Sequence, residues 1–239
     1  MNEQFEFIHH DTNIRGAVLN EKKLGAKAIL LYRKLQHLCC NFWNNKIASL
    51  ISRPQAGLRS EAFLYPMPVL IIGTYDENGK PNAMNAAWGG ISEETQISIC
   101  VDDRHKTAKN VVKAGAFTVS VADAENVIAC DYVGIASGNK EPNKIEKAGW
   151  HVTKSEFVNA PLFDELPMAL ECRLISYDEE TCRLVGEIVN VCADERILDD
   201  NDKIDLNKFS PITYDPVYHT YRKIGDIVGK AFRDGMNLK

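Results

Sequence analysis

Short apolar runs with the pattern of β-strands dominate the chain beyond about residue 62. The run from Pro68 to Tyr75 is continuously apolar and rich in β-branched residues, which predicts a strand buried on both faces. Asp76 to Gly79 is a tight-turn pattern, in which Gly79 supplies the positive φ of a hairpin. Further strands are predicted over Asn82 to Trp88, Gln96 to Val101 and Ala116 to Ala122. This part of the chain is therefore predicted to be mainly β.

A long hairpin is predicted later in the chain. Met168 to Ser176 and Arg183 to Val191 are two strand-like runs joined by a polar turn. The first run alternates, with Leu170, Cys172 and Leu174 facing one way and Glu171 and Arg173 the other. Only short helices are predicted, over His105 to Ala114, Ala124 to Ile135 and Asn143 to Ala148. Many short strands with few helices favour a closed antiparallel barrel over a parallel α/β fold.

The first 61 residues follow a different pattern, which predicts a helical extension. Six apolar residues recur at helical spacing on one face: Leu24, Ala28, Leu31, Leu35, Leu38 and Phe42. Three interpretations of this stripe are open. It is a self-association helix, or a helix that packs on its own barrel, or a helix that binds a membrane surface with the help of the basic residues that flank it. We expect an extension over residues 1–61 and a β-barrel domain over residues 62–239.

Composition excludes some classes of protein. A formal net charge of −5 argues against nucleic-acid binding, which normally needs a basic surface. No apolar run approaches the roughly 20 residues of a membrane span, and the polar start from Met1 to Asp11 lacks the apolar core of a secretion signal. The 7 cysteines show no C-x-x-C spacing, so we expect buried, reduced thiols in a cytoplasmic protein.

The sequence lacks the familiar catalytic motifs. It contains no G-x-x-x-x-G-K-[ST] phosphate loop, no G-x-G-x-x-G turn, no G-x-S-x-G elbow and no H-E-x-x-H. The 6 histidines are scattered without metal-ligand spacing, so we predict no metal site, and we assign no catalytic side chain. Scarcity of candidate catalytic groups favours chemistry carried by a bound organic cofactor.

One segment suits the binding of a flat heterocycle. Asn82 to Gly90 combines small side chains, two asparagines and two closing glycines. Asparagine amides offer donors and acceptors to the edge of a ring, and small residues let the backbone approach the ring closely. A glycine-rich strand at a tight barrel corner is the plainer interpretation of the same residues.

A second segment, Asp103 to Asn110, is a candidate phosphate site. It is predicted at a junction between a strand and a helix, where free N–H groups and the helix dipole attract anions. Lys106 adds a point charge, and Arg104 offers a fork of donors. A solvated basic helix start is the alternative, and the polar turn from Ser137 to Lys140 is a further phosphate candidate.

Together these residues resemble the flavin reductase, or flavoredoxin-like, family. The most specific part is Asn82-Ala83-Met84-Asn85-Ala86-Ala87-Trp88-Gly89-Gly90, preceded by Leu64-Tyr65-Pro66-Met67-Pro68-Val69 and Gly73-Thr74-Tyr75. Further similar stretches are Lys106-Thr107 with Asn110, Asp131-Tyr132-Val133-Gly134, Ser137-Gly138, Leu166 to Cys172, Gly186-Glu187-Ile188 and Gly229-Lys230-Ala231-Phe232. The resemblance covers about residues 62–239, and Ile29 to Ala62 looks like an insertion.

The resemblance implies an FMN-binding split β-barrel of Greek-key topology that works as a homodimer. It implies that the flavin ring lies against main chain and side chains of Asn82, Ala83, Met84, Asn85 and Ala87. It places the phosphate against His105, Lys106, Thr107 and Asn110, and brings Ser137 near the flavin or a second substrate. We interpret Trp88 as a core residue rather than one that stacks on the flavin.

The leading functional hypothesis is an oxidoreductase that passes electrons from NADH or NADPH through FMN to a flavin, a partner protein or another small molecule. The alternative is a flavoredoxin-type electron carrier without its own nicotinamide site. A third hypothesis, from outside redox chemistry, is a β-barrel binding module whose N-terminal helix recruits a partner.

Overall fold

The structure is a computed structural model of the chain and describes residues 8–10, 13–15 and 61–238. The chain divides into two compact units, residues 1–61 and 62–239, each of which is described by itself. In the first unit, β1 (Ile8–His10) and β2 (Asn13–Arg15) pair as an antiparallel hairpin that the sequence pattern did not predict. The helical stripe predicted from Leu24 to Phe42 lies outside the described residues.

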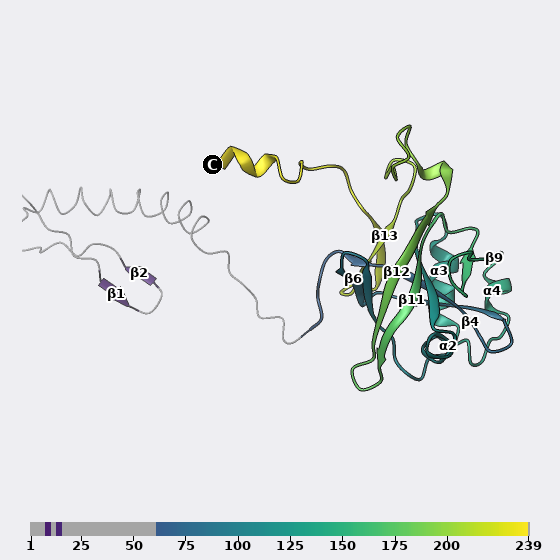
Figure 1. Ribbon diagram of the computed structural model, residues 1–239. Helices are drawn as coiled ribbons and strands as arrows, with labels where there is room; N and C mark the ends of the chain where they lie inside the picture. The colour runs from purple at the N-terminus through teal and green to yellow at the C-terminus, as the bar shows by residue number, and fades with distance from the viewer. Residues whose placement is uncertain (1–7, 11–12, 16–60, 239) are drawn as a thin grey trace, which may run out of the picture. The chain divides into compact units, whose positions relative to one another are not determined.

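An antiparallel sheet of seven strands forms the framework of the second unit (Figure 1). From one edge to the other its strand order is β5, β4, β8, β11, β12, β7, β6. The strands are β4 (Leu70–Tyr75), β5 (Pro81–Ala86), β6 (Gly89–Glu93), β7 (Gln96–Cys100), β8 (Ala116–Val121), β11 (Met168–Asp178) and β12 (Arg183–Ala193). Because β8 crosses away from β7 to lie between β4 and β11, the strands follow the Greek-key order, and the predicted mainly-β split barrel is confirmed.

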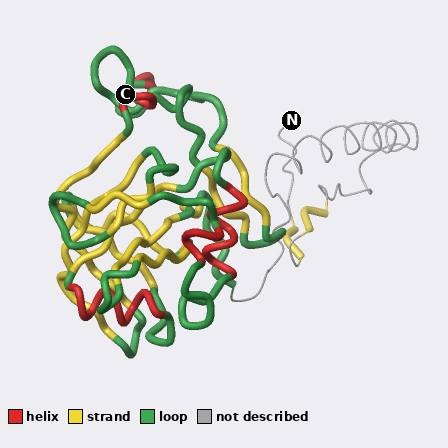
Figure 2. Tube along the Cα trace, turned by 90° about the vertical axis from the view of Figure 1, so that its right-hand side faces the viewer, coloured by secondary structure: helices red, strands yellow, loops and turns green. Residues whose placement is uncertain are grey.

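Smaller elements surround this sheet, and Figure 2 shows short helices at its periphery. The helices are α2 (Lys106–Ala114), α3 (Val127–Ile135) and α4 (Lys144–Lys147), with 3₁₀ turns η2 (Glu195–Ile197) and η3 (Asp234–Leu238). β3 (Met67–Pro68), β13 (Ile212–Asp215) and β14 (Thr220–Lys223) form a three-stranded sheet, and β9 (Val152–Lys154) pairs with β10 (Pro161–Phe163).

Strand β4 is covered on both faces, as its continuous apolar run predicts. Leu70 and Ile72 belong to the core inside the curled sheet, which also contains residues of α2. Ile71 belongs to a second core on the opposite face, together with residues of α3. Among the described strands β5 pairs only with β4, and the same division places alternate residues of β5 in two different environments.

Two expectations about the site region were wrong in detail. The strand predicted from Asn82 to Trp88 ends at Ala86, and a separate strand, β6, begins at Gly89 on the opposite edge of the sheet. Trp88 lies in the turn between these two strands and is 54% exposed, so it is not a core residue. The alternation of hydrophobicity could not detect the break, because small residues fit a turn and a strand equally well.

The long hairpin β11–β12 carries a further difference. Its sequence pattern groups Glu171 with Arg173 on the face opposite the apolar residues, yet Glu171 is only 1% exposed. The side-chain amide of Asn190, directly across the hairpin, donates a hydrogen bond to the Glu171 carboxylate. A buried carboxylate needs such a donor, so this partner is what makes the burial of Glu171 tolerable.

Candidate functional site

The candidate site is a cavity of about 420 Å³ beside the turn that joins the two edge strands β5 and β6. Its wall comes from four parts of the second unit: the end of β5 with the following turn, the loop before α2, one face of α3, and the β13–β14 hairpin. Its lining residues are Met84, Asn85, Ala86, Ala87, Trp88, Cys100, Asp102, His105, Asp131, Gly134, Ile135, Tyr214 and Tyr221. A largely apolar pocket of this size with a few polar groups suits an organic ligand.

The cavity brings together part of the site predicted from the sequence. Met84, Asn85, Ala87 and His105 line it. Ala83 does not: its side chain is fully buried in the core beneath α3, so only its main chain lies at the open edge of the sheet. Ala83 and Asn85 share a face of β5, so the difference between them comes from their position along the strand, of which only the last residues border the cavity.

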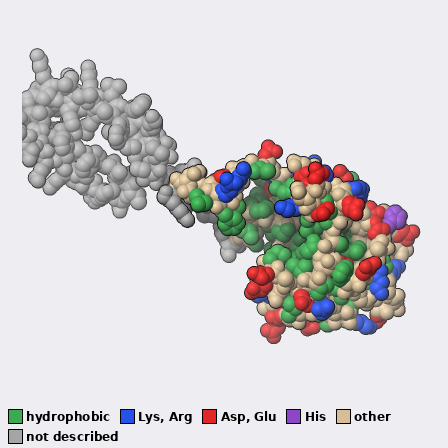
Figure 3. Space-filling view, turned by 45° about the horizontal axis from the view of Figure 1, so that its top comes forward, with side chains coloured by type: hydrophobic (Ala, Val, Ile, Leu, Met, Phe, Trp, Pro, Cys, Tyr) green, Lys and Arg blue, Asp and Glu red, His purple; other side chains and the backbone are tan. Residues whose placement is uncertain are grey.

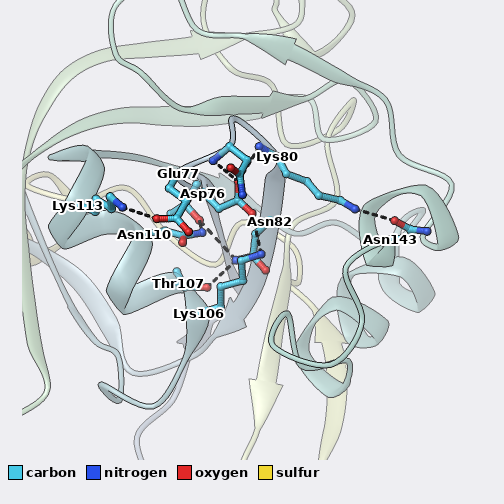
Figure 4. A network of polar contacts seen from close by, with 11 residues as sticks. Asp76, Glu77, Lys80, Asn82, Lys106, Thr107, Asn110, Lys113 and Asn143 are labelled. Carbon is cyan, nitrogen blue, oxygen red and sulfur yellow. Dashed lines mark hydrogen bonds and ion pairs between the residues drawn. The ribbon is translucent and has the colours of Figure 1, made fainter.

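Three of the remaining predicted residues, Asn82, Thr107 and Asn110, form a buried polar cluster with Thr74 of β4 (Figure 4). Asn82 Nδ2 donates to Thr107 Oγ1 at 2.9 Å, and Asn110 Nδ2 donates to Thr74 Oγ1 at 3.0 Å. All four side chains are buried. Thr107 therefore links the first turn of α2 to Asn82 on β5, and Asn110 links the helix to Thr74 on β4. The fold thus joins the two segments that the sequence suggested for the ring and for the phosphate.

Lys106 stands at the first position of α2 and makes an ion pair with Asp76 from the β4–β5 turn, with Nζ and Oδ2 2.9 Å apart. Asp76 also accepts hydrogen bonds from the backbone N–H groups of Asn78 and Lys80. Burial alone would raise the pKa of Asp76, but these hydrogen bonds, led by that from Lys106, lower it below its usual value. The carboxylate thus stays charged and holds the Lys106 ammonium in place.

The N-terminus of α2 is open to a ligand. Its N-cap residue, His105, makes no capping hydrogen bond with its side chain, and the first turn contains no acidic residue. The first N–H groups of the helix therefore remain available for an anion. Arg104, expected to add donors, instead pairs with Asp102 through both Nε and Nη2, at 2.8 and 2.7 Å, and its side chain is 85% exposed.

The loop from Ser137 to Lys140 packs against this cluster. A Cβ on Gly138 would collide with Asn82 Oδ1 and would lie 3.3 Å from Lys106 Cδ, so only glycine permits this approach. Ser137 itself is exposed and does not line the cavity. The structure therefore places the loop beside the predicted phosphate residues, with its backbone rather than Ser137 at closest approach.

A second lysine lies near Lys106 and was not singled out by sequence reasoning. Lys144 is 4% exposed, and its Nζ donates to the carbonyl oxygens of Val133 and Ala136, at 3.1 and 2.8 Å, at the end of α3. Burial, followed by repulsion from Lys106, lowers the pKa of Lys144 to about 8. The Lys144 ammonium is thus held at the end of α3, near enough to Lys106 for the two charges to repel each other.

The cavity is also lined by a hydrogen-bonded pair, Tyr221 and Asp131, that the sequence did not reveal. Tyr221 Oη donates to Asp131 Oδ1 at 2.7 Å, and burial, followed by this carboxylate, raises the pKa of the tyrosine. Asn85 Nδ2 donates to the carbonyl oxygen of Cys130 at 3.0 Å, which fixes its amide against α3. Only the stretch Asp131 to Gly134 gave a sequence signal, through the family resemblance; Tyr221 and its neighbour Tyr214 gave none.

The cysteines only partly follow the expectation of buried thiols. Cys130 and Cys172 are buried, which raises the pKa of each thiol to about 12. Cys100, however, is exposed and lines the cavity. Within the described ranges, no group of three or more metal-ligating side chains is present. No helix in those ranges is long and apolar enough to cross a membrane.

Comparison with known proteins agrees with this architecture. Residues 62–222 match the family described as the flavin reductase like domain. The chain belongs to this family. The match contains every residue that lines the cavity and every member of the buried polar cluster. Family membership and this fold indicate a flavin-related redox function.

Two solved structures are similar to most of the chain. Flavoredoxin of Desulfovibrio vulgaris (Miyazaki F) is 36% identical with a TM-score of 0.73, and the match covers 76% of this chain and 100% of that one. Flavoredoxin from Methanosarcina acetivorans is 28% identical with a TM-score of 0.70, over 78% of this chain and 100% of that one. An uncharacterized protein of Aeropyrum pernix is 28% identical over 121 residues, which are 50% of this chain and 46% of that protein.

Proposed function

We propose that this protein binds FMN in the cavity beside β5 and works as an oxidoreductase that accepts electrons from NADH or NADPH. The observation that carries the proposal is the open N-terminus of α2 with Lys106 fixed beside it, next to a largely apolar cavity that the N-cap residue His105 lines. FMN has both a phosphate and a flat ring, so it fits an anion-binding helix N-terminus that lies next to an apolar cavity. The flavin reductase-like family supplies the flavin part of the argument.

Different residues are proposed to bind the phosphate and the ring of FMN. Lys106 and the first N–H groups of α2 bind the phosphate, and Lys144 adds positive potential to that region. The edge of β5 from Asn82 to Ala87 faces the ring with its main chain, and Asn85 presents an amide whose orientation α3 fixes. The chemistry that bound FMN supplies is acceptance of a hydride from a reduced nicotinamide and delivery of the electrons to an acceptor.

The acceptor is proposed to be a flavin, another small molecule or a partner protein. Trp88 and Tyr214, whose ring centroids lie 6.5 Å apart, form an aromatic side of the cavity against which a planar acceptor or nicotinamide ring can pack. We also propose that the protein is a homodimer and resides in the cytoplasm. The five cysteines in the described ranges are free thiols, as expected in a reducing compartment.

A second candidate function is that of a flavoredoxin-type electron carrier without its own nicotinamide site. The observation that favours it is the similarity, at 36% and 28% identity, to two proteins described as flavoredoxins. Both candidate functions use the same flavin site, so the structure of that site favours neither of them.

An absorbance spectrum of the purified protein, recorded without air before and after adding NADH or NADPH, tests both. We expect a flavin band that bleaches on adding one of the two nicotinamides. A band that persists with both nicotinamides and bleaches with dithionite would favour the carrier. A protein that shows no flavin band even after incubation with FMN would refute both candidates.

A further inference from the structure

Lys144 is a buried cation without a counter-charge in the described part of the chain. It is the first residue of α4 and is 4% exposed, and its Nζ donates to the carbonyl oxygens of Val133 and Ala136. None of the ion pairs among the described residues includes it. The two carbonyls close α3, and the end of a helix carries only about half a negative charge. The chain therefore balances the Lys144 ammonium only in part.

Cations at the surface differ from Lys144 in this respect. On the face of the second unit that Figure 3 shows, Lys and Arg side chains are scattered among Asp and Glu side chains. Lys147, on the same helix as Lys144, has a side chain that is 56% exposed and pairs with Glu141. Water and salt screen such charges, whereas a buried charge normally needs a partner of opposite sign. The unbalanced charge of Lys144 thus favours a bound anion that is not part of the chain.

The loop between α3 and α4 connects Lys144 with the open end of α2. It leaves α3 at the carbonyls that Lys144 binds, and two residues further on an added Cβ at Gly138 would lie 3.3 Å from Cδ of Lys106. The side-chain amide of Asn139 donates to the carbonyl oxygen of Arg104 at 3.1 Å, directly before the N-cap of α2. One end of the loop is thus held by Lys144, and its middle lies against the proposed phosphate site.

Asp76 balances Lys106 and leaves Lys144 unbalanced. Lys106 is paired with Asp76 at 2.9 Å, and the backbone N–H of Lys80 donates to the same carboxylate (Figure 4). Asn143, directly before Lys144, is joined to this turn by a hydrogen bond from Lys80 Nζ at 2.7 Å. Burial, followed by repulsion from Lys106, lowers the pKa of Lys144 to about 8. A phosphate dianion beside Lys106 would oppose that repulsion, because a nearby negative charge favours the ammonium form.

Other titratable groups surround Lys144, but Lys106 is the one whose charge acts on its pKa. Strand β5, against which α4 packs, contains no titratable side chain. The groups on the other neighbouring elements are Cys130, Asp131 and Tyr132 of α3, Asp76 and Lys80 of the β4–β5 turn, and Lys140, Glu141, Glu146 and Lys147 in α4 or the loop before it. A change in the charge beside Lys106 is therefore what Lys144 is placed to respond to.

We propose that Lys144 balances the charge of the FMN phosphate, and that its amine takes up a proton from solvent when FMN binds. This inference rests on the proposed FMN site. Lys144 acts as a positioning residue, through its charge and through the carbonyls and loop that it holds. A phosphate monoester is already a dianion above about pH 7, since its second pKa is about 6. The proton therefore goes to Lys144 Nζ, and the affinity for FMN falls as pH rises through the pKa of the free amine.

Titration of the flavin-free full chain with FMN and with riboflavin, between about pH 7 and about pH 9, tests this coupling. The affinity of the native chain for FMN should fall about five- to tenfold across this range. The affinity for riboflavin should not follow it, because riboflavin has no phosphate. Lys144→Met should remove the dependence on pH. Lys147→Met, which removes an exposed lysine of the same helix, is the matched control and should behave like the native chain.

Calorimetry of the native chain measures the proton itself and does not depend on the stability of any variant. FMN binding at about pH 8.5, in two buffers that differ in enthalpy of ionisation, should show uptake of about half a proton to one proton per FMN. A lysine that only closes α3 would take up none. FMN that binds without proton uptake, a fall in affinity shared equally by riboflavin, or a fall that persists in Lys144→Met would overturn the role of Lys144. A protein that binds neither flavin would instead overturn the proposed function, and this inference with it.

Discussion

Removal of the Lys106 side chain tests the phosphate site directly. Lys106 stands at the open end of α2 and is held by Asp76 at 2.9 Å. A charge-assisted hydrogen bond to a phosphate contributes about 1.5–3 kcal/mol. Lys106→Ala should therefore weaken FMN binding about ten- to a hundredfold. Riboflavin has the same ring but no phosphate, so its affinity should remain unchanged.

Folding should be much less affected by the same substitution. The side chains of Lys106 and Asp76 are 23% and 12% exposed, and a pair near the surface contributes about 0–1 kcal/mol. Asp76 also keeps its two hydrogen bonds from backbone N–H groups, so it is not left without a partner. For a chain of this size the melting temperature should fall by no more than about 4 °C.

The assay is a titration of flavin-free protein with FMN and with riboflavin, followed by flavin fluorescence, together with thermal unfolding. Lys113→Ala is the matched control, because Lys113 lies in the last turn of α2 and pairs with Glu77 in a far more exposed position. Equal losses of affinity for FMN and riboflavin would refute a phosphate role for Lys106. Unchanged affinity for both would move the phosphate elsewhere, with Ser137 to Lys140 as the next candidate.

Three further outcomes are expected for folding. Gly73→Ala places a Cβ 2.9 Å from Phe163 in a closely packed region and should lower the free energy of unfolding by about 1–3 kcal/mol, measured in urea. Asn190→Ala removes the amide that bonds the buried Glu171 carboxylate and should cost about 1–3 kcal/mol in the same measurement. Because burial lowers the pKa of Lys144 to about 8, the unfolded chain binds more protons between about pH 8 and about pH 10, and the free energy of unfolding should rise with pH across that window.

Each of these has a control within the chain. Gly90→Ala, at a position with nothing within 4 Å of an added Cβ, should be close to neutral, and an equal loss there would contradict the packing argument. Adding Glu171→Gln to Asn190→Ala should recover stability, because it removes the buried charge. Lys144→Met should flatten the rise with pH; a rise of the same size in that variant would assign it to another group.

The sequence determined the class of the fold and predicted two candidate site segments. The continuous run from Pro68 to Tyr75 predicted a strand covered on both faces, which β4 is, and Gly79, whose φ is +75°, predicted the turn after it. The helix predicted over His105 to Ala114 is α2, which begins one residue later at Lys106. These are local properties, set by side-chain periodicity and backbone freedom, and a single sequence carries them.

Tertiary structure decided which of those residues share a site. Asn82 meets Thr107 only because β5 and α2 pack together, whereas Ala83, one residue later, points into the opposite core. Tyr221 reaches Asp131 across 90 residues, and Glu171 is buried because Asn190 lies opposite it. Contacts between residues so far apart depend on strand order and packing, which no pattern along the chain records.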